Sequence, residues 1–214
     1  GAPISRGFLT ERRFGLHGES KYIDCLERTL YNGVISGMSM DGGRFFYPNP
    51  LSSDGKYAFN ADNTKTRQPW FGCACCPSNL CRFIPSVPGY LYGVKDNNIY
   101  VNLFAANTST IQVGGKDVVL EESTQYPWDG DIQIRVVKSA AKNANLLVRI
   151  PGWVQNQVLP SDLYKYSDTA KPAYNVSVNG KKIEADFVAN KGYLPVKNIK
   201  KGDVVRIHFD MPVR

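Results

Sequence analysis

The feature that most constrains the fold of this 214-residue sequence is a change of hydrophobic period near residue 88. Beyond that point, apolar and polar residues alternate in short segments that turn-forming residues separate, which is the pattern of half-buried β-strands. Nine short strands at this spacing predict an antiparallel β-sandwich. The segments are residues 90–94, 99–104, 110–113, 118–122, 131–137, 144–150, 174–178, 192–196 and 203–209. Asn179-Gly180, between the seventh and eighth segments, predicts a type I′ turn because both residues tolerate positive φ.

The residues before 88 predict helices and a long loop instead. Ile23, Leu26 and Leu30 recur at helical spacing within residues 20–33, and Gly33 can supply a left-handed C-terminal cap. We expect residues 5–16 to form a preceding helix, which Gly15 and Gly18 would break. Residues 38–76 are rich in Gly, Pro, Asn and aromatic residues, which is typical of a functional loop packed on a scaffold. The chain is therefore predicted to be α+β and mainly β, with one domain at residues 1–88 and another at 89–214.

Composition argues against two classes of partner. The formal net charge is +7, but the basic residues form only scattered doublets with acidic neighbours, so we expect no nucleic-acid binding. No apolar run approaches the length of about 20 residues that spans a bilayer, so we expect no membrane insertion. A hydrophobic content of 43% with 21% charged residues is ordinary for a globular protein.

Four of the five cysteines, Cys73, Cys75, Cys76 and Cys81, lie within nine positions. Thiolates are strong ligands for soft metals and good nucleophiles, so this clustering indicates chemistry. A structural zinc site usually takes paired ligands from two separate segments, and this chain has no second cysteine cluster. His208 fits a half-exposed strand position better than a metal ligand. The residues alone therefore favour a partial metal site that needs ligands from elsewhere.

Pro77-Ser78-Asn79 follows the adjacent pair Cys75-Cys76 and is typical of a helix start. Thiols in the first turn of a helix have a lowered pKa, which suits metal binding and nucleophilic attack alike. The alternative is that these cysteines are small residues buried in a tight turn.

Four motifs stand out along the chain: residues 26–33 (LERTLYNG), 45–51 (FFYPNPL), 71–79 (FGCACCPSN) and 149–153 (RIPGW). In sequence and in order they resemble glycoside hydrolase family 127, the β-L-arabinofuranosidases, and the related family 146. The resemblance implies an (α/α)6 barrel followed by β-sandwich domains, and zinc held by one Glu and three Cys. It implies that residues 1–88 are the end of the barrel with its active-site loop.

By this resemblance Cys75 is the catalytic nucleophile and a zinc ligand, and Cys76 is a further zinc ligand. Glu27 and Tyr47 match positions that contact the sugar. Cys73 and Cys81 do not match ligand positions, and Cys25 is expected in the core. The implied reaction is attack of the Cys75 thiolate on the anomeric carbon of a furanosyl unit, with retained configuration.

The resemblance also implies that part of the site lies outside this chain. Counting back from Glu27 by the family's spacing places the Cys of a Glu-x-Cys zinc pair at position 1, where this chain has Gly1. We therefore expect an internal fragment whose zinc site is incomplete, whose general acid lies upstream, and which is inactive alone. Its partners would be arabinofuranoside-containing glycans and the upstream barrel; a cytoplasmic and a periplasmic location in a bacterium both stay open.

Two other functions stay open from the residues. The strand-rich part, with aromatic residues such as Trp128 and Trp153, is compatible with a non-catalytic carbohydrate-binding module. The cysteine cluster is compatible with a small metal-binding or redox protein.

Overall fold

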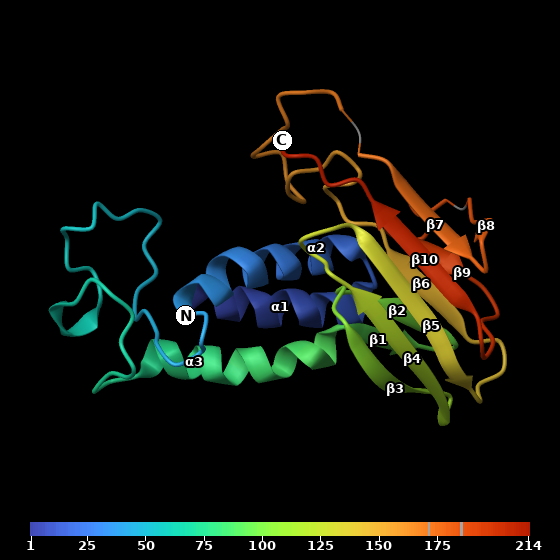
Figure 1. Cartoon of the computed structure of the whole chain (residues 1–214), viewed down its shortest axis with the longest axis horizontal. Helices are drawn as coiled ribbons and strands as arrows, with labels where there is room; N and C mark the ends of the chain where they lie inside the picture. Colours follow the sequence, from blue (N-terminus) through green and yellow to red (C-terminus); the bar gives the residue numbers. More distant parts are fainter. Residues whose placement is uncertain (171, 185) are drawn as a thin grey trace. The chain divides into compact units, whose positions relative to one another are not determined.

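The computed structural model describes residues 1–170, 172–184 and 186–214, which divide into two compact units (Figure 1). The helical unit comprises residues 1–13 and 25–89, and the sandwich unit comprises residues 14–24 and 90–214. Helices α1 (Ala2–His17) and α2 (Ser20–Arg28) each contribute residues to both. The prediction of a chain that is α+β and mainly β is confirmed.

In the helical unit, α1 packs closely against α3 (Cys75–Phe83). Gly7 makes this contact possible, because a Cβ added there would lie 2.6 Å from Cζ of the fully buried Phe83. The Phe8 and Phe83 rings meet edge to face with centroids 5.1 Å apart. A 3-10 segment (Ile84–Tyr90) continues α3 toward the sandwich sequence.

Two details of the predicted helices are wrong. Helix α1 runs through Gly15 without interruption, although it does end before Gly18, which has a positive φ of 65°. The second helix does not end at Gly33 in a left-handed cap. After α2 it continues as a π-helix (Thr29–Val34) and a 3-10 turn (Ile35–Gly37). The continued turn fully buries Val34, a gain that outweighs the cap. π-Helical turns are often found at functional sites.

The loop after this turn is irregular, as predicted. The isolated bridges Met38–Phe45 and Phe45–Gln68 hold it together, and a 3-10 turn (Ala61–Asn63) lies within it. The buried rings of Phe45 and Phe71 anchor its two ends.

The sandwich unit contains two sheets (Figure 1). The four-stranded sheet has the order β1-β2-β6-β9, and the six-stranded sheet has the order β3-β4-β5-β10-β7-β8. Their strands are β1 (Tyr92–Lys95), β2 (Asn98–Val101), β3 (Asn107–Val113), β4 (Lys116–Thr124), β5 (Asp131–Ser139), β6 (Asn145–Arg149), β7 (Tyr174–Val178), β8 (Lys181–Lys182), β9 (Tyr193–Val196) and β10 (Val204–Phe209). All nine predicted strands are present. The two-residue strand β8 was not predicted.

A single cluster of buried apolar side chains from both sheets fills the sandwich. Asn179 and Gly180 have φ of 50° and 80°, which confirms the positive-φ turn between β7 and β8. One strand pair departs from the prediction of an antiparallel sandwich, because β2 and β6 are parallel. Trp153 packs on Phe209 of this core, with centroids 5.9 Å apart.

A buried ion pair fastens residues 20–24 to the sandwich strands within this unit. Arg149, at the end of β6, is fully buried and lies 2.6 Å from the Asp24 carboxylate. The guanidinium also donates to the Asn102 carbonyl oxygen at 2.6 Å, and the Asn102 side chain accepts from the Tyr193 hydroxyl at 2.7 Å. These hydrogen bonds satisfy charges that would be costly to bury alone.

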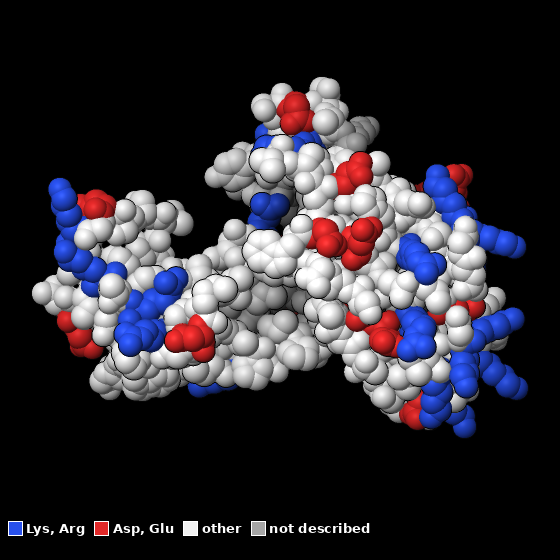
Figure 2. All heavy atoms as spheres, in the orientation of Figure 1, with Lys and Arg blue, Asp and Glu red and all other residues white. Residues whose placement is uncertain are grey.

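Basic side chains on the face of the molecule in Figure 2 are interspersed with acidic ones. No helix in the described part of the chain is long and apolar enough to cross a membrane.

Candidate active site

The first turn of α3 places Cys75 and Cys76 side by side, as the helix-start signal predicted. Pro77 fits this turn because its missing N–H would have no helical partner there. The Cys75 carbonyl oxygen accepts hydrogen bonds from the Ser78 hydroxyl at 3.1 Å and the Asn79 amide at 2.6 Å. Cys75 is exposed and Cys76 is half-buried, so the alternative of two buried packing residues does not hold.

The Tyr47 hydroxyl lies 2.5 Å from Cys75 Sγ, which brings two of the predicted site residues into direct contact. This hydrogen bond is the main cause that lowers the pKa of the Cys75 thiol, and further hydrogen bonds from Cys76 and Cys73 act in the same direction. The same contact raises the pKa of Tyr47, so the phenol keeps its proton and donates a hydrogen bond to the sulfur. The contact therefore favours the thiolate form of Cys75 more than solvent would.

A buried asparagine that the sequence analysis did not single out holds Tyr47 in place. Asn60 is 4% exposed, and its side-chain oxygen accepts from the Tyr47 backbone N–H at 2.8 Å. Its amide group donates to the Thr66 carbonyl oxygen at 2.8 Å. The Tyr47 ring also meets Phe71 edge to face at 5.5 Å. The irregular loop is thus fixed by a buried polar residue and ring contacts rather than by strand pairing.

Cys76 completes a pair of thiols at metal-binding distance. Its Sγ is 4.0 Å from Cys75 Sγ, and two thiolates on one tetrahedral zinc, with Zn–S of about 2.3 Å, lie about 3.8 Å apart. Burial is the main cause that raises the pKa of Cys76, and the hydrogen bond with Cys75 acts in the same direction. In the described residues no three metal-ligating side chains converge, so the two cysteines fit part of a zinc site.

A cavity of about 590 Å³ opens beside Cys76 in the helical unit. Residues of the π-helical turn, the 45–51 motif and the chain start line it, including Gly1, Ser36, Tyr47 and Asn49. The Asn49 amide donates to the Ser36 hydroxyl at 2.7 Å, which ties the motif to the turn. Ser36 carried no signal in the sequence, because only the unexpected continuation of the helix brings it here.

The other residues singled out in the sequence differ in their surroundings. Glu27, in the last turn of α2, is 7% exposed and is not among the described residues that line the cavity. Cys73 and Cys81 are exposed. Cys25 is only partly buried rather than a core residue, and its sulfur accepts a hydrogen bond from Arg6 at 2.8 Å.

Comparison with known families decides what kind of protein carries this site. The GH127 β-L-arabinofuranosidase catalytic domain matches residues 2–89, and the GH127 middle domain matches residues 98–211. The chain belongs to the GH127 β-L-arabinofuranosidase family. This family is one of glycoside hydrolases, and the resemblance of the four motifs is confirmed.

Individual proteins that are similar to this chain support its membership of the family. A non-reducing end β-L-arabinofuranosidase of Bifidobacterium longum subsp. longum is 30% identical over 223 residues, covering 100% of this chain and 30% of that protein. A solved GH127 β-arabinofuranosidase is 54% identical with a TM-score of 0.90, covering 99% of this chain and 32% of its own. A GH127 β-L-arabinofuranosidase from Geobacillus stearothermophilus T6 is 36% identical with a TM-score of 0.80, covering 99% and 31%. The chain thus spans about a third of the length of these relatives.

Proposed function

We propose that this GH127 chain is part of a zinc-dependent, retaining β-L-arabinofuranosidase in which Cys75 is the nucleophile. The observation that supports this most is the hydrogen bond of 2.5 Å between the Tyr47 hydroxyl and Cys75 Sγ at a helix N-terminus, with a lowered pKa of the thiol. In this proposal residues 1–88 are the end of an (α/α)6 barrel, and residues 89–214 are a β-sandwich domain.

The reaction proceeds in two displacements. In the first, Cys75 Sγ attacks the anomeric carbon of the furanosyl unit while the bond to the leaving oxygen breaks. A general acid supplied by another part of the full-length protein protonates that oxygen. In the second, water attacks the same carbon and gives up a proton, and the thiolate leaves. Two inversions give net retention, as in two-carboxylate enzymes.

The two thiols fit zinc, with the other ligands supplied from upstream of this chain. Bound zinc keeps a coordinating cysteine deprotonated at neutral pH. In this proposal the Tyr47 hydroxyl orients Cys75 Sγ through its hydrogen bond, and it would contact the sugar bound beside that sulfur. Glu27 is the second proposed sugar contact, which it would make from the last turn of α2.

Substitution of Cys75 in the full-length protein tests the nucleophile. Cys75→Ser is expected to lower kcat on an arabinofuranoside by more than about a thousandfold, since a hydroxyl is a far weaker nucleophile than a thiolate. Cys81→Ser is the matched control, because Cys81 lies on the same helix and is also exposed, and it is expected to keep most of the activity. Comparable activity of the Cys75 and Cys81 variants would refute the assignment.

The zinc proposal has its own test in the 214-residue chain. Gly1 lines the cavity beside Cys76, so Gly1→Cys is expected to add a third thiolate and lower the Kd for zinc by at least about tenfold. Competition with a chromogenic chelator measures this affinity. Ala2→Cys, one position along, is the control. If neither cysteine tightens binding, position 1 is not a zinc-ligand position.

A further inference from the structure

Strand β3, at one edge of the six-stranded sheet, differs from the other edge strands of the sandwich unit. In the described part of the chain, β1, β9, β3 and β8 lie at the edges of the two sheets (Figure 1). All but β3 carry features that discourage pairing with a further strand. β1 is four residues long and ends in Lys95, and β9 contains Pro195, which has no N–H. β8 consists only of Lys181 and Lys182.

β3 is the longest of these edge strands, and it carries no charge. Its seven residues read NTSTIQV. The side chains of Thr108, Thr110 and Gln112 are exposed, while those of Ile111 and Val113 are buried in the core. An uncharged strand rich in β-branched residues, with its edge open, is a template for pairing with a further strand.

The hairpin that joins β3 to β4 determines which backbone groups of β3 point outward. Gly114 and Gly115 form its two-residue loop, with φ of 55° and 73°. Positive φ at both positions is typical of a type I′ turn, which the flanking pair Val113–Lys116 closes with hydrogen bonds. Hydrogen-bonded positions alternate along an antiparallel pair, so every second residue of β3 turns its N–H and C=O away from β4. These outward residues are Thr108, Thr110 and Gln112.

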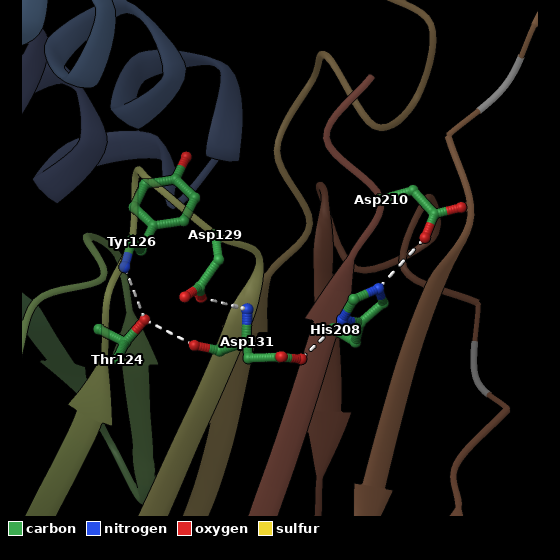
Figure 3. Close-up of polar contacts among 6 residues, drawn as sticks. All are labelled: Thr124, Tyr126, Asp129, Asp131, His208 and Asp210. Carbon is green, nitrogen blue, oxygen red and sulfur yellow. Dashed lines mark hydrogen bonds and ion pairs between the residues drawn. The ribbon is translucent and has the colours of Figure 1, made fainter. Parts of the chain in front are cut away.

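Side-chain hydrogen bonds reinforce the sheet next to β3. The Thr124 hydroxyl, at the end of β4, donates to the Asp131 carbonyl oxygen at 2.7 Å (Figure 3). The His208 ring on β10 bonds to the Asp131 carboxylate at 2.6 Å. β4, β5 and β10 are thereby joined by side chains as well as by their backbone ladders. The edge strand therefore lies on a fixed support, which lowers the entropy cost of adding a strand.

The carboxylates opposite the exposed face of β3 are already paired within the sheet. Asp117 and Glu121 lie across from β3 on β4. Asp117 bonds to Lys138 at 2.8 Å, and Glu121 pairs with Arg135. These two negative charges are thereby neutralised, and β3 adds none of its own. Two copies of this edge can therefore meet without repulsion between these groups.

We propose that β3 pairs antiparallel with β3 of a second copy of this chain, with Thr110 of one copy opposite Thr110 of the other on a two-fold axis. This register places Thr108 opposite Gln112, so the outward N–H and C=O groups of all three residues gain partners. Cross-strand Thr–Thr pairs add to the stability of such a sheet. Both copies use the same edge, so the pairing closes at a dimer. The joined sheet then ends on both sides in the lysines of β8.

Analytical ultracentrifugation of the 214-residue chain under reducing conditions tests the proposal. One strand pair is smaller than a standard interface, so we expect weak association, seen as a rise in average mass between roughly 10 μM and 1 mM. Thr110→Lys is expected to raise the Kd of the dimer about tenfold, because it places like charges opposite each other. Asn175→Lys, at an exposed position of β7 in the same sheet, is the matched control and is expected to leave the Kd unchanged.

A mixture of Thr110→Lys and Thr110→Glu chains tests the register and keeps the result independent of any loss of folding. In the proposed pairing the added positive charge of one chain faces the added negative charge of the other. The mixture is therefore expected to associate more strongly than either variant alone. The proposal is overturned if the wild type stays monomeric, if Thr110→Lys and Asn175→Lys behave alike, or if the mixture associates no better than its components.

Hydrogen exchange in the full-length protein identifies any other occupant of this edge. The Thr110 amide is expected to exchange more slowly as the protein concentration rises, because its N–H gains a partner only in the dimer. Protection that is equally strong at low concentration would mean that another segment of the polypeptide pairs with β3, and would overturn the assignment to a second copy. The dimer does not depend on the proposed hydrolysis, and Cys75→Ser is expected to associate as the wild type does. Failure of the dimer and failure of the nucleophile are therefore separate results.

Discussion

The two units of this chain achieve order in different ways. The sandwich unit buries one continuous apolar cluster between two hydrogen-bonded sheets. The helical unit carries the candidate active site on an irregular loop and the first turn of a helix, held by a buried asparagine, ring contacts and isolated bridges. The sandwich strands are joined by repeated backbone hydrogen bonds, whereas the loop is held mainly by individual side-chain contacts.

This difference fits the division of tasks expected in an enzyme. Regular strands give rigidity from many equivalent contacts, while loops can place a specific atom such as the Tyr47 hydroxyl at a specific sulfur. In the described part of the sandwich unit, the buried charged side chains are exceptions to the apolar interior, namely Arg149, which pairs with Asp24, and Glu122. These exceptions are where its stability can be tested most directly.

The largest effect on stability is expected from breaking the buried ion pair. Asp24→Ala leaves the fully buried Arg149 without its carboxylate and is expected to lower the free energy of unfolding by about 3–5 kcal/mol. Asp117→Ala removes a surface partner of Lys138 and is expected to cost at most about 1 kcal/mol. Urea unfolding followed by fluorescence measures both. Equal costs would mean that the buried pair adds nothing to the apolar core.

The second effect is a pH dependence from Glu122. Burial is the main cause that raises its pKa to about 7, although Tyr92 and the Ala105 N–H hydrogen-bond to it. The unfolded chain therefore loses the proton first, and stability falls as pH rises from about 4.5 to about 7. The loss is on the order of 3 kcal/mol. Glu122→Gln is expected to remove this slope, that is, the fall in the free energy of unfolding between about pH 4.5 and about pH 7.

Glu121→Gln is the matched control for that prediction. Glu121 neighbours Glu122 on β4 but is partly exposed and pairs with Arg135, so its substitution is expected to leave the slope in place. Unfolding in urea at pH 5, 6, 7 and 8 separates the two variants. If the free energy of unfolding depends on pH equally in the Glu122 and Glu121 variants, the buried carboxyl group of Glu122 is not the source of that dependence.

The third effect concerns the loop. Asn60→Ala leaves the Tyr47 N–H and the Thr66 carbonyl oxygen without their partner and is expected to cost about 1–3 kcal/mol locally. Hydrogen exchange at the Tyr47 amide is expected to speed up by about tenfold or more, while exchange in β4 and β5 stays unchanged. Lys65→Ala, at an exposed position of the same loop, is the control. Faster exchange across both units after Asn60→Ala would show that the loop is not a separate element.

The sequence predicts the sandwich well because its signals are local. Each strand has its own two-residue period, and Asn179-Gly180 marks a hairpin by its backbone preferences alone. The parallel pairing of β2 with β6 was not predicted, because it joins residues such as Asn98 and Asn145 that are far apart in sequence. Strand β8 was missed because two residues carry no period.

The candidate site was predictable in part. The helix start at Pro77 placed Cys75 and Cys76 in a first turn from local signals, and the family resemblance pointed to Tyr47. The role of Asn60 was not predictable, because its hydrogen bond reaches across 13 residues of irregular chain. The extension past Gly33 was not predictable either, since its gain is the burial of Val34 in tertiary structure.

The smallest expected effect returns to the sandwich, at His208. The hydrogen bond to Asp131 is the main cause that raises its pKa, so its stabilisation is present below about pH 6.5 and is lost as pH rises through the folded-state pKa. The ring is half exposed, so solvent screening limits the effect to a few tenths of a kcal/mol, on the order of other surface pairs. His208→Asn is expected to flatten the pH dependence of the melting temperature between pH 6 and 8, and His17→Asn, an exposed histidine of the same unit, is expected to leave it unchanged. A larger change from the His17 variant than from the His208 variant would contradict a stabilising contact between His208 and Asp131. Of Glu122 and His208, only Glu122 would then contribute to the pH dependence of stability.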